Sequence, residues 1–151
     1  MPGRTRILIG MSRRLTGAIA LLVLLSGCSA VGRSATYPLA HTPRLTDLSD
    51  RSWVAKSISD RGIVAGTVIR LTFTGNTVTA SAGCNTLHGE ASIDKHELVV
   101  GPLAATKVGC DPMLEAQDRW VGSFLAARPT IERQSNELWL SRRDTVLHLT
   151  S

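Results

Sequence analysis

Residues 69–82 read Ile69-Arg-Leu-Thr-Phe-Thr-Gly-Asn-Thr-Val-Thr-Ala-Ser-Ala82, and they hold the clearest structural signal in the chain. Apolar and polar side chains alternate on both sides of the central Gly75-Asn76 pair, which is the period of a strand with one buried face. Glycine and asparagine favour tight turns between strands. The stretch therefore predicts a β-hairpin that buries its apolar face.

Short segments of the same kind occur on both sides of this hairpin. Further strands are expected near Trp53–Ile58, Glu90–Ile93, Glu97–Val100, Thr130–Arg133, Glu137–Leu140 and Val146–Leu149. Together with the hairpin they make about eight short strands separated by polar turns, which is typical of a barrel or a sandwich.

One segment has the period of a helix. Asp111 can cap a helix that begins at Pro112, where the missing N–H group is not needed. Pro129 disfavours helical geometry at Arg128, so the helix is expected to end there. Its apolar side chains recur at helical spacing and predict one stripe that packs on an open end or a face of the β structure, formed by Met113, Ala116, Trp120, Val121, Phe124 and Leu125.

Length and charge limit the classes of protein to consider. The chain has 151 residues, of which 43% are hydrophobic and 19% charged, so we expect one globular domain with a tail. The net charge is +5, but four of the arginines lie in residues 1–27, and 13 basic residues then remain against 12 acidic ones. No basic stripe follows, so we expect no nucleic-acid binding.

Residues 1–27 have the layout of an export signal. Arg13 and Arg14 precede an apolar run from Leu15 to Leu25, and small residues follow. Eleven residues in a helix span about 16 Å, roughly half of the ~30 Å hydrocarbon core, so a membrane-spanning helix is not expected.

The end of this signal resembles the bacterial lipobox. Leu25-Ser26-Gly27-Cys28 places a branched residue and two small residues before a cysteine. The resemblance implies that the Cys28 thiol takes a diacylglyceryl group and becomes the lipidated amino terminus after cleavage. Residues 28–50, with Pro38 and Pro43, then form a flexible tether, and residues 51–151 form the domain.

Two cysteines remain in the domain, and three interpretations of them stay open. Cys84 and Cys110 can form a disulfide, which the oxidising compartment outside the membrane favours. They can also bind Zn²⁺ with His88 and perhaps His96, although no Cys-x-x-Cys pair occurs. In the third interpretation Cys84 is a nucleophile with His88 as its base. We favour the disulfide because of the compartment.

The sequence lacks the motifs of common enzyme classes. It has no Gly-x-Ser-x-Gly, P-loop, Rossmann glycine pattern or His-Glu-x-x-His. The acidic residues are scattered singly. We therefore predict no enzymatic activity, no catalytic residue, no cofactor and no bound metal.

Residues 48–150 resemble the META domain of heat-inducible bacterial envelope lipoproteins. The resemblance rests on Trp53, on Gly83-Cys84-Asn85 with Gly89 after it, on Leu98 and Gly101-Pro102-Leu103, on Ala105-Thr106 with Cys110, and on Met113 and Phe124-Leu125 in the helix. The chain departs from the family at Glu90-Ala91, where an aromatic residue is common. The acidic residue of the helix is Glu115 or Asp118.

This resemblance implies a mostly β (α+β) fold, a small lipocalin-like antiparallel barrel or curled sheet of about eight short strands with one amphipathic helix packed on it. It also implies a secreted or membrane-anchored protein with a role in envelope integrity or stress response. Together with the lipobox, we expect a monomer anchored on the extracytoplasmic face of a bacterial membrane. The expected partner is an unknown envelope protein, and the alternative is a small hydrophobic ligand or antibiotic carried in the barrel. Gly83, Cys84, Asn85, Gly89, Thr106 and Cys110 are expected to be a structural motif.

Overall fold

A computed structural model describes residues 39–151. The predicted signal peptide, Cys28 and most of the predicted tether lie outside these residues. The elements in chain order are η1 (Leu45–Leu48), β1 (Ser52–Ile58), β2 (Arg70–Thr74), β3 (Thr77–Ser81), β4 (Thr86–Asp94), β5 (Glu97–Val100), β6 (Ala104–Ala105), α1 (Pro112–Ala126), β7 (Thr130–Gln134), β8 (Glu137–Arg142) and β9 (Thr145–Thr150).

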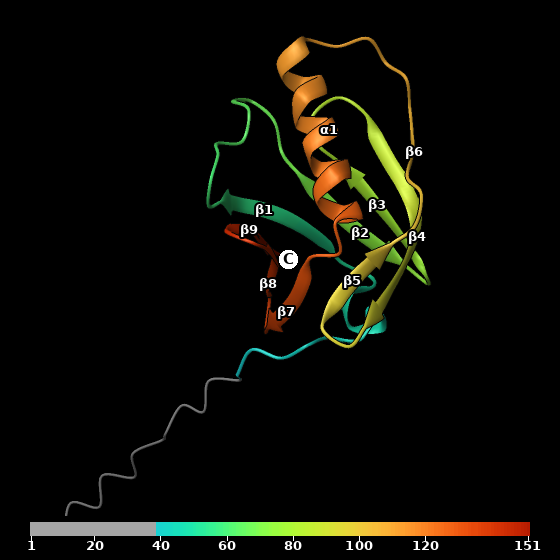
Figure 1. Cartoon of the computed structure of the whole chain (residues 1–151), viewed down its shortest axis with the longest axis vertical. Helices are drawn as coiled ribbons and strands as arrows, with labels where there is room; N and C mark the ends of the chain where they lie inside the picture. Colours follow the sequence, from blue (N-terminus) through green and yellow to red (C-terminus); the bar gives the residue numbers. More distant parts are fainter. Residues whose placement is uncertain (1–38) are drawn as a thin grey trace, which may run out of the picture. The chain divides into compact units, whose positions relative to one another are not determined.

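The strands form a closed antiparallel barrel, as predicted (Figure 1). Neighbours around the ring are β3, β2, β1, β9, β8, β7, β5 and β4, and the pairing of β3 with β4 closes it. The short strand β6 lies outside the ring and pairs with the first part of β4. Closure leaves almost no free strand edges, so few backbone groups are exposed to pairing with strands of other chains.

The hairpin predicted from residues 69–82 is confirmed as β2 and β3. Phe73 pairs with Val78 and Leu71 pairs with Ala80, and all of these side chains are buried inside the barrel. Strands such as β4 and β8 likewise send every second side chain inward, whereas a bulge between Ala55 and Ser57 interrupts the alternation in β1. The interior is packed with side chains, among them the fully buried Trp53.

Two strands differ from the sequence-based expectation. β4 begins at Thr86, four residues before the predicted strand near Glu90, because Leu87 and Gly89 continue the buried face toward the barrel end. β6 was not predicted, since it has only two exposed residues, Ala104 and Ala105, and their side chains carry no alternation signal.

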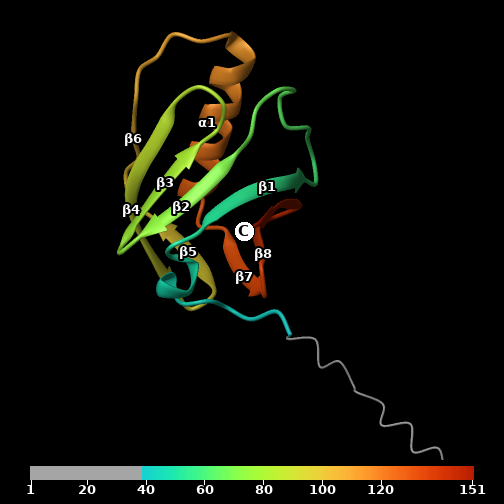
Figure 2. The ribbon, with the colours of Figure 1, turned by 180° about the vertical axis from the view of Figure 1, so that it is seen from behind.

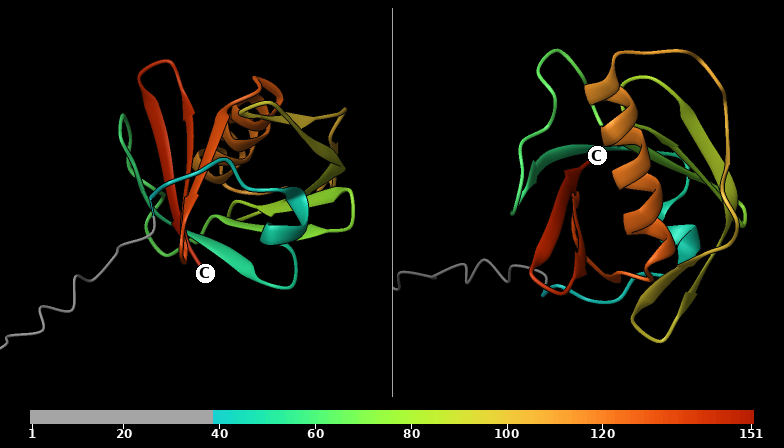
Figure 3. Two further views of the ribbon diagram at one scale, coloured as in Figure 1. Left: turned by 90° about the horizontal axis from the view of Figure 1, so that it is seen from below. Right: turned by 45° about the horizontal axis from the view of Figure 1, so that its top comes forward.

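The two ends of the barrel are closed by different elements (Figures 2 and 3). α1 lies at the end where the β1–β2, β3–β4 and β8–β9 connections gather; Gln117 and Asp118 hydrogen-bond to the first two, and Phe124 lines a recess together with the third. At the opposite end η1 inserts Leu48, which is completely buried, and the Trp53 indole N–H donates to the Leu48 carbonyl at 3.0 Å. The folded domain therefore includes residues 45–50, which the sequence placed in the tether.

The helix begins as predicted but ends earlier. The Asp111 carboxylate accepts a hydrogen bond from the Met113 N–H at 2.8 Å, and Pro112 is the first helical residue. The last helical residue is Ala126, because Arg128 before Pro129 takes a left-handed backbone conformation with φ of 56°. No helix within residues 39–151 is long and apolar enough to span a bilayer.

The buried face of α1 differs from the predicted stripe in its first half. Met113 is 64% exposed and Ala116 is also exposed. Gln117 and Asp118 are buried in their place, while Val121, Phe124 and Leu125 are buried as predicted. A count of apolar residues could not find this face, because two polar side chains occupy it and are held there by hydrogen bonds.

Candidate functional site

The predicted motif Gly83-Cys84-Asn85 forms the connection from β3 to β4 at the α1 end. Gly83 has φ of 113°, and a Cβ atom there would lie 2.9 Å from Cγ2 of Thr67. Only glycine takes this backbone conformation without strain, so the residue is required for the bend. The bend turns the backbone and side chain of Asn85 toward the helix.

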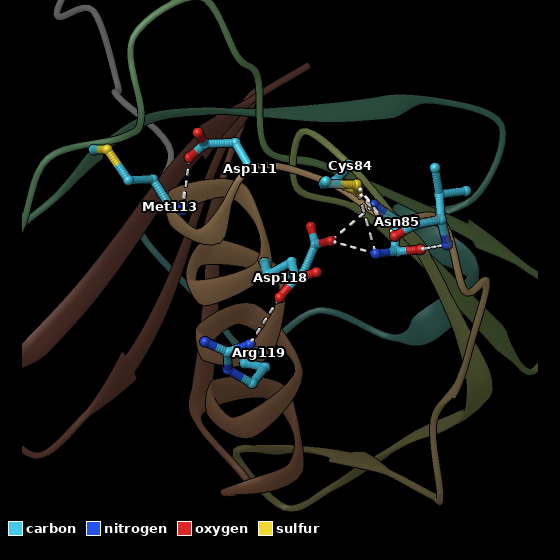
Figure 4. A network of polar contacts seen from close by, with 9 residues as sticks. Cys84, Asn85, Asp111, Met113, Asp118 and Arg119 are labelled. Carbon is cyan, nitrogen blue, oxygen red and sulfur yellow. Dashed lines mark hydrogen bonds and ion pairs between the residues drawn. A yellow bond between two sulfur atoms is a disulfide. The ribbon is translucent and has the colours of Figure 1, made fainter.

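Asn85 joins three segments through its side chain (Figure 4). Its Nδ2 donates to Asp118 Oδ2 at 3.0 Å, and its backbone N–H donates to the same oxygen at 2.8 Å. Its Oδ1 accepts from the Thr106 hydroxyl at 3.0 Å and from the Val108 N–H at 2.9 Å. One amide thus holds β4, the helix and the 101–110 segment at fixed distances from one another.

Asp118 is one of the two candidates for the acidic residue of the helix, and it is the one that contacts the motif. It is 5% exposed, its Oδ2 accepts both bonds from Asn85, and its Oδ1 has no partner among the described residues. Glu115, the other candidate, lies nearer the surface and makes an ion pair with Arg119 at 3.6 Å. Of the two acids, Asp118 and not Glu115 is therefore the one bonded to the Gly83-Cys84-Asn85 connection.

Gln117 is a second buried polar residue, and sequence reasoning missed it. Its Oε1 accepts from the Val64 N–H at 2.7 Å, and its Nε2 donates to the Thr67 hydroxyl and to the Ala82 carbonyl. The helix is thereby fastened to the β1–β2 connection as well as to the β3–β4 connection. The sequence held one indication of its burial: Gln117 and Asp118 lie one helical turn before Val121 and therefore share its face.

Cys84 and Cys110 form a disulfide, as predicted, with their Cα atoms 6.3 Å apart. The bond fixes the end of the 101–110 segment, just before the helix, to the β3–β4 connection. Neither thiol is then free to act as a nucleophile or to bind zinc. Within residues 39–151 no three His, Cys, Asp or Glu side chains gather as a metal site would need.

The remaining motif residue, Gly89, allows a close crossing of two chain segments. A Cβ atom at this buried position would lie 3.0 Å from Cδ2 of Leu103 and 3.1 Å from the Pro102 carbonyl oxygen. The absence of a side chain lets the 101–110 segment lie directly against β4. All six predicted motif residues thus act on the same small region at the α1 end.

A groove of about 910 Å³ lies between α1 on one side and β4 and the 101–110 segment on the other. Its apolar lining includes Leu87, Val100, Leu103 and Ala126, and the small residue Gly122 faces it from the helix. This volume is within the usual range of small-molecule sites, about 300–1,000 Å³. The groove is the largest recess among those we describe, and the motif residues form its frame.

A separate set of contacts lies on the other side of α1. The Arg61 guanidinium lies 4.7 Å from the centre of the Trp120 ring, which stacks on Phe124. Hydrogen bonds from Arg61, with a further bond from the Thr145 hydroxyl, lower the pKa of the Asp60 carboxyl below its usual value. These exposed contacts connect the β1–β2 loop to the helix but enclose no comparable apolar space.

Comparison with protein families identifies the domain. Residues 46–151 match the sequence model of the META domain, which is well over half of the chain. The chain belongs to the META domain family. The match begins at Thr46, inside η1, so the buried turn at the η1 end of the barrel is part of the META domain. No curated protein matches the chain.

Two solved structures share the fold of this META domain. A protein structure determined by NMR is 21% identical, has a TM-score of 0.61, and the alignment covers 72% of this chain and 94% of that one. The NMR structure of a protein from Burkholderia xenovorans is 20% identical, with a TM-score of 0.57 and coverage of 74% and 91%. At these identities the likeness concerns the fold alone.

Proposed function

We propose that the protein is a lipoprotein, anchored on the extracytoplasmic face of a bacterial membrane, whose META domain acts by binding and not by catalysis. The lipobox-like Leu25-Ser26-Gly27-Cys28 supports the anchor, and the Cys84–Cys110 disulfide is consistent with an oxidising compartment. In this proposal the bound molecule is recognised near the membrane surface and contributes to envelope integrity.

The observation that carries the binding role is the groove beside α1. The carboxamide of Asn85, the Asp118 carboxylate and the disulfide connect the segments that form its walls. Polar groups that fix the walls around an open apolar space are the arrangement of a preformed ligand site. It favours a small hydrophobic ligand, bound at the mouth of the barrel because the interior is filled.

An envelope protein that inserts an apolar segment is the other candidate occupant of this groove. Native mass spectrometry separates the two. Material purified from its host membrane should carry a small bound mass, and Ser123→Trp, which fills the groove from an exposed helix position, should lose it. Ala116→Trp, on another side of the same helix, should retain it. The occupant is instead an envelope protein if the unsubstituted protein carries no small mass but crosslinks to such a protein, and Ser123→Trp abolishes the crosslink.

The anchor is tested by the intact mass of the mature protein. We expect a chain that begins at Cys28, carries acyl groups and lacks the two hydrogens of the Cys84–Cys110 pair. Cys28→Ser should leave the protein unacylated and release it from the membrane. An unprocessed, unacylated chain recovered from the cytosol would contradict the anchor.

A further inference from the structure

We infer that the groove binds a small amphiphile whose head group donates a hydrogen bond to Oδ1 of Asp118, with its apolar tail along the second half of α1. The inference rests on the proposed binding role and adds the chemistry by which the ligand is recognised. It follows from one buried oxygen that the fold leaves without a donor at the polar end of the groove.

The Asp118 carboxylate has one more acceptor than the fold uses. Its Oδ2 accepts from the backbone N–H of Asn85 at 2.8 Å and from Nδ2 of Asn85 at 3.0 Å, whereas Oδ1 is buried and has no partner among residues 39–151. A buried acceptor without a hydrogen bond costs free energy. An asparagine at this position would accept both bonds through its single carbonyl oxygen, so the second carboxylate oxygen is not needed to hold the helix.

This oxygen belongs to a residue that lines the groove. The Asp118 side chain points from α1 toward Asn85 (Figure 4), and both residues line the groove. The other unpartnered buried side-chain atom among residues 39–151 is Nε of Arg133, which lies in β7 and lines none of the recesses we describe. A missing donor and a space that can hold a ligand therefore coincide at Asp118.

A head group can reach Oδ1 because the neighbouring side chains are weakly held. Glu115 lies one helical turn before Asp118 on the same face of α1, and it pairs with Arg119 at 3.6 Å. The Arg119 side chain is 69% exposed and that of Glu115 is 43% exposed, so this ion pair contributes little and opens at little cost. The polar end of the groove can therefore adjust as a ligand enters.

The charges of the lining do not select a charged head group. Two cations, Lys107 and Arg119, line the groove together with two carboxylates, Glu115 and Asp118. The property that this end selects is a hydrogen-bond donor, such as a hydroxyl or a primary amide N–H, and not a net charge. A head group that can only accept hydrogen bonds would place its lone pairs against Oδ1.

The other end of the groove fits an apolar tail. Toward the end of α1 the lining consists of apolar or small residues: Val100, Pro102, Leu103, Gly122 and Ala126. Gly122 is in the interior of the helix, where glycine is unfavourable. A Cβ atom there would lie 3.5 Å from Cδ1 of Leu87, so a larger side chain would take up space that glycine leaves to the groove.

Two pairs of isomers test the inference, because the members of each pair share a formula and differ in whether they donate. 1-Octanol donates and 1-methoxyheptane does not; octanamide donates and N,N-dimethylhexanamide does not. Each is titrated by NMR against ¹⁵N-labelled residues 28–151 carrying Cys28→Ser, so that no acyl chain of the protein competes. We expect the donor of each pair to bind about tenfold more tightly, the ratio for one hydrogen bond to a charged acceptor.

Substitutions locate the partner of the donor. Asp118→Asn keeps an oxygen for the two bonds from Asn85 and puts an NH2 group in place of Oδ1, so the preference for donors should disappear or reverse. Glu132→Gln also removes one carboxylate charge, on the exposed outer wall, and should leave the preference unchanged. Ser123→Trp should abolish binding of all four ligands. Circular dichroism of each variant verifies that the barrel remains folded.

The outcomes separate the inference from the proposed function. If the isomers of each pair bind the groove with equal affinity, or if Asp118→Asn leaves the preference unchanged, the donor class is wrong while the groove remains a binding site. If none of the four binds, the inference is overturned, and native mass spectrometry of protein from its host decides the proposed function separately. If Ser123→Trp leaves binding intact, both the inference and the groove as a ligand site are overturned.

Discussion

The two ends of this barrel are closed by opposite means. At the η1 end Leu48 is completely buried, and the buried Trp53 indole donates a hydrogen bond to its carbonyl. At the α1 end a 15-residue helix lies over the opening, and its contact is polar in the first half of the helix, at Gln117 and Asp118, and apolar in the second half. The first end is packed, and the second retains a groove of about 910 Å³.

This difference shows how a barrel of modest size can keep a space open. An apolar contact collapses until its side chains interlock, because dispersion and burial both favour close packing. Hydrogen bonds instead fix the helix in one position and orientation, since an amide or carboxylate must keep its partners at about 2.7–3.2 Å and in a defined direction. The polar frame at the α1 end therefore determines where the helix lies, and the groove remains beside it.

The largest expected effect comes from removing the covalent part of that frame. Cys84→Ala with Cys110→Ala should lower the free energy of unfolding by about 3.5 kcal/mol, the chain-entropy value for a link between residues 26 apart. Urea denaturation measures it, and reduction of the unsubstituted protein should give a similar loss. A loss under about 1 kcal/mol would mean that the hydrogen bonds hold the end without the disulfide.

The packed end should respond nearly as strongly to one apolar truncation. Leu48→Ala should cost about 3 kcal/mol, since it leaves a cavity under a fully buried position. Leu39→Ala is the matched control, because Leu39 is 85% exposed and its truncation should change stability by less than about 0.5 kcal/mol. Equal effects of the two substitutions would contradict the packing described for η1.

The polar frame should show a smaller but position-specific cost. Asp118→Ala should lose about 2 kcal/mol, because two donors of Asn85 are left without their acceptor in a largely buried site. Glu115→Ala, one turn earlier, should lose less than about 0.5 kcal/mol, since its ion pair is exposed. If the order of the two were reversed, Glu115 and not Asp118 would be the structural acid of the helix.

The sequence predicts the wall of the barrel better than its ends. The hairpin of residues 69–82 and the pairs around β8 follow from alternation, which depends only on neighbouring residues. The cap at Asp111 and the pairing of Cys84 with Cys110 are likewise confirmed. The hairpin, the strand pairs and the cap each leave a pattern in neighbouring residues. The disulfide was predicted because the compartment outside the membrane is oxidising.

The groove and its frame could not be derived in this way. Gln117 and Asp118 are polar, so periodicity placed Met113 and Ala116 on the buried face instead. Leu48 lies in a stretch rich in turn-forming residues and gives no signal that it fills the barrel. Both errors concern residues whose burial depends on partners that are distant in the chain.

The most direct test of a binding groove at one end only is an NMR titration of the ¹⁵N-labelled chain with a small hydrophobic probe, dodecanol. The account predicts shifts at Lys107, Ser123 and Ala126, with the amides of Leu48 and Trp53 unmoved. Shifts at η1, or shifts spread evenly over the barrel wall, would contradict it.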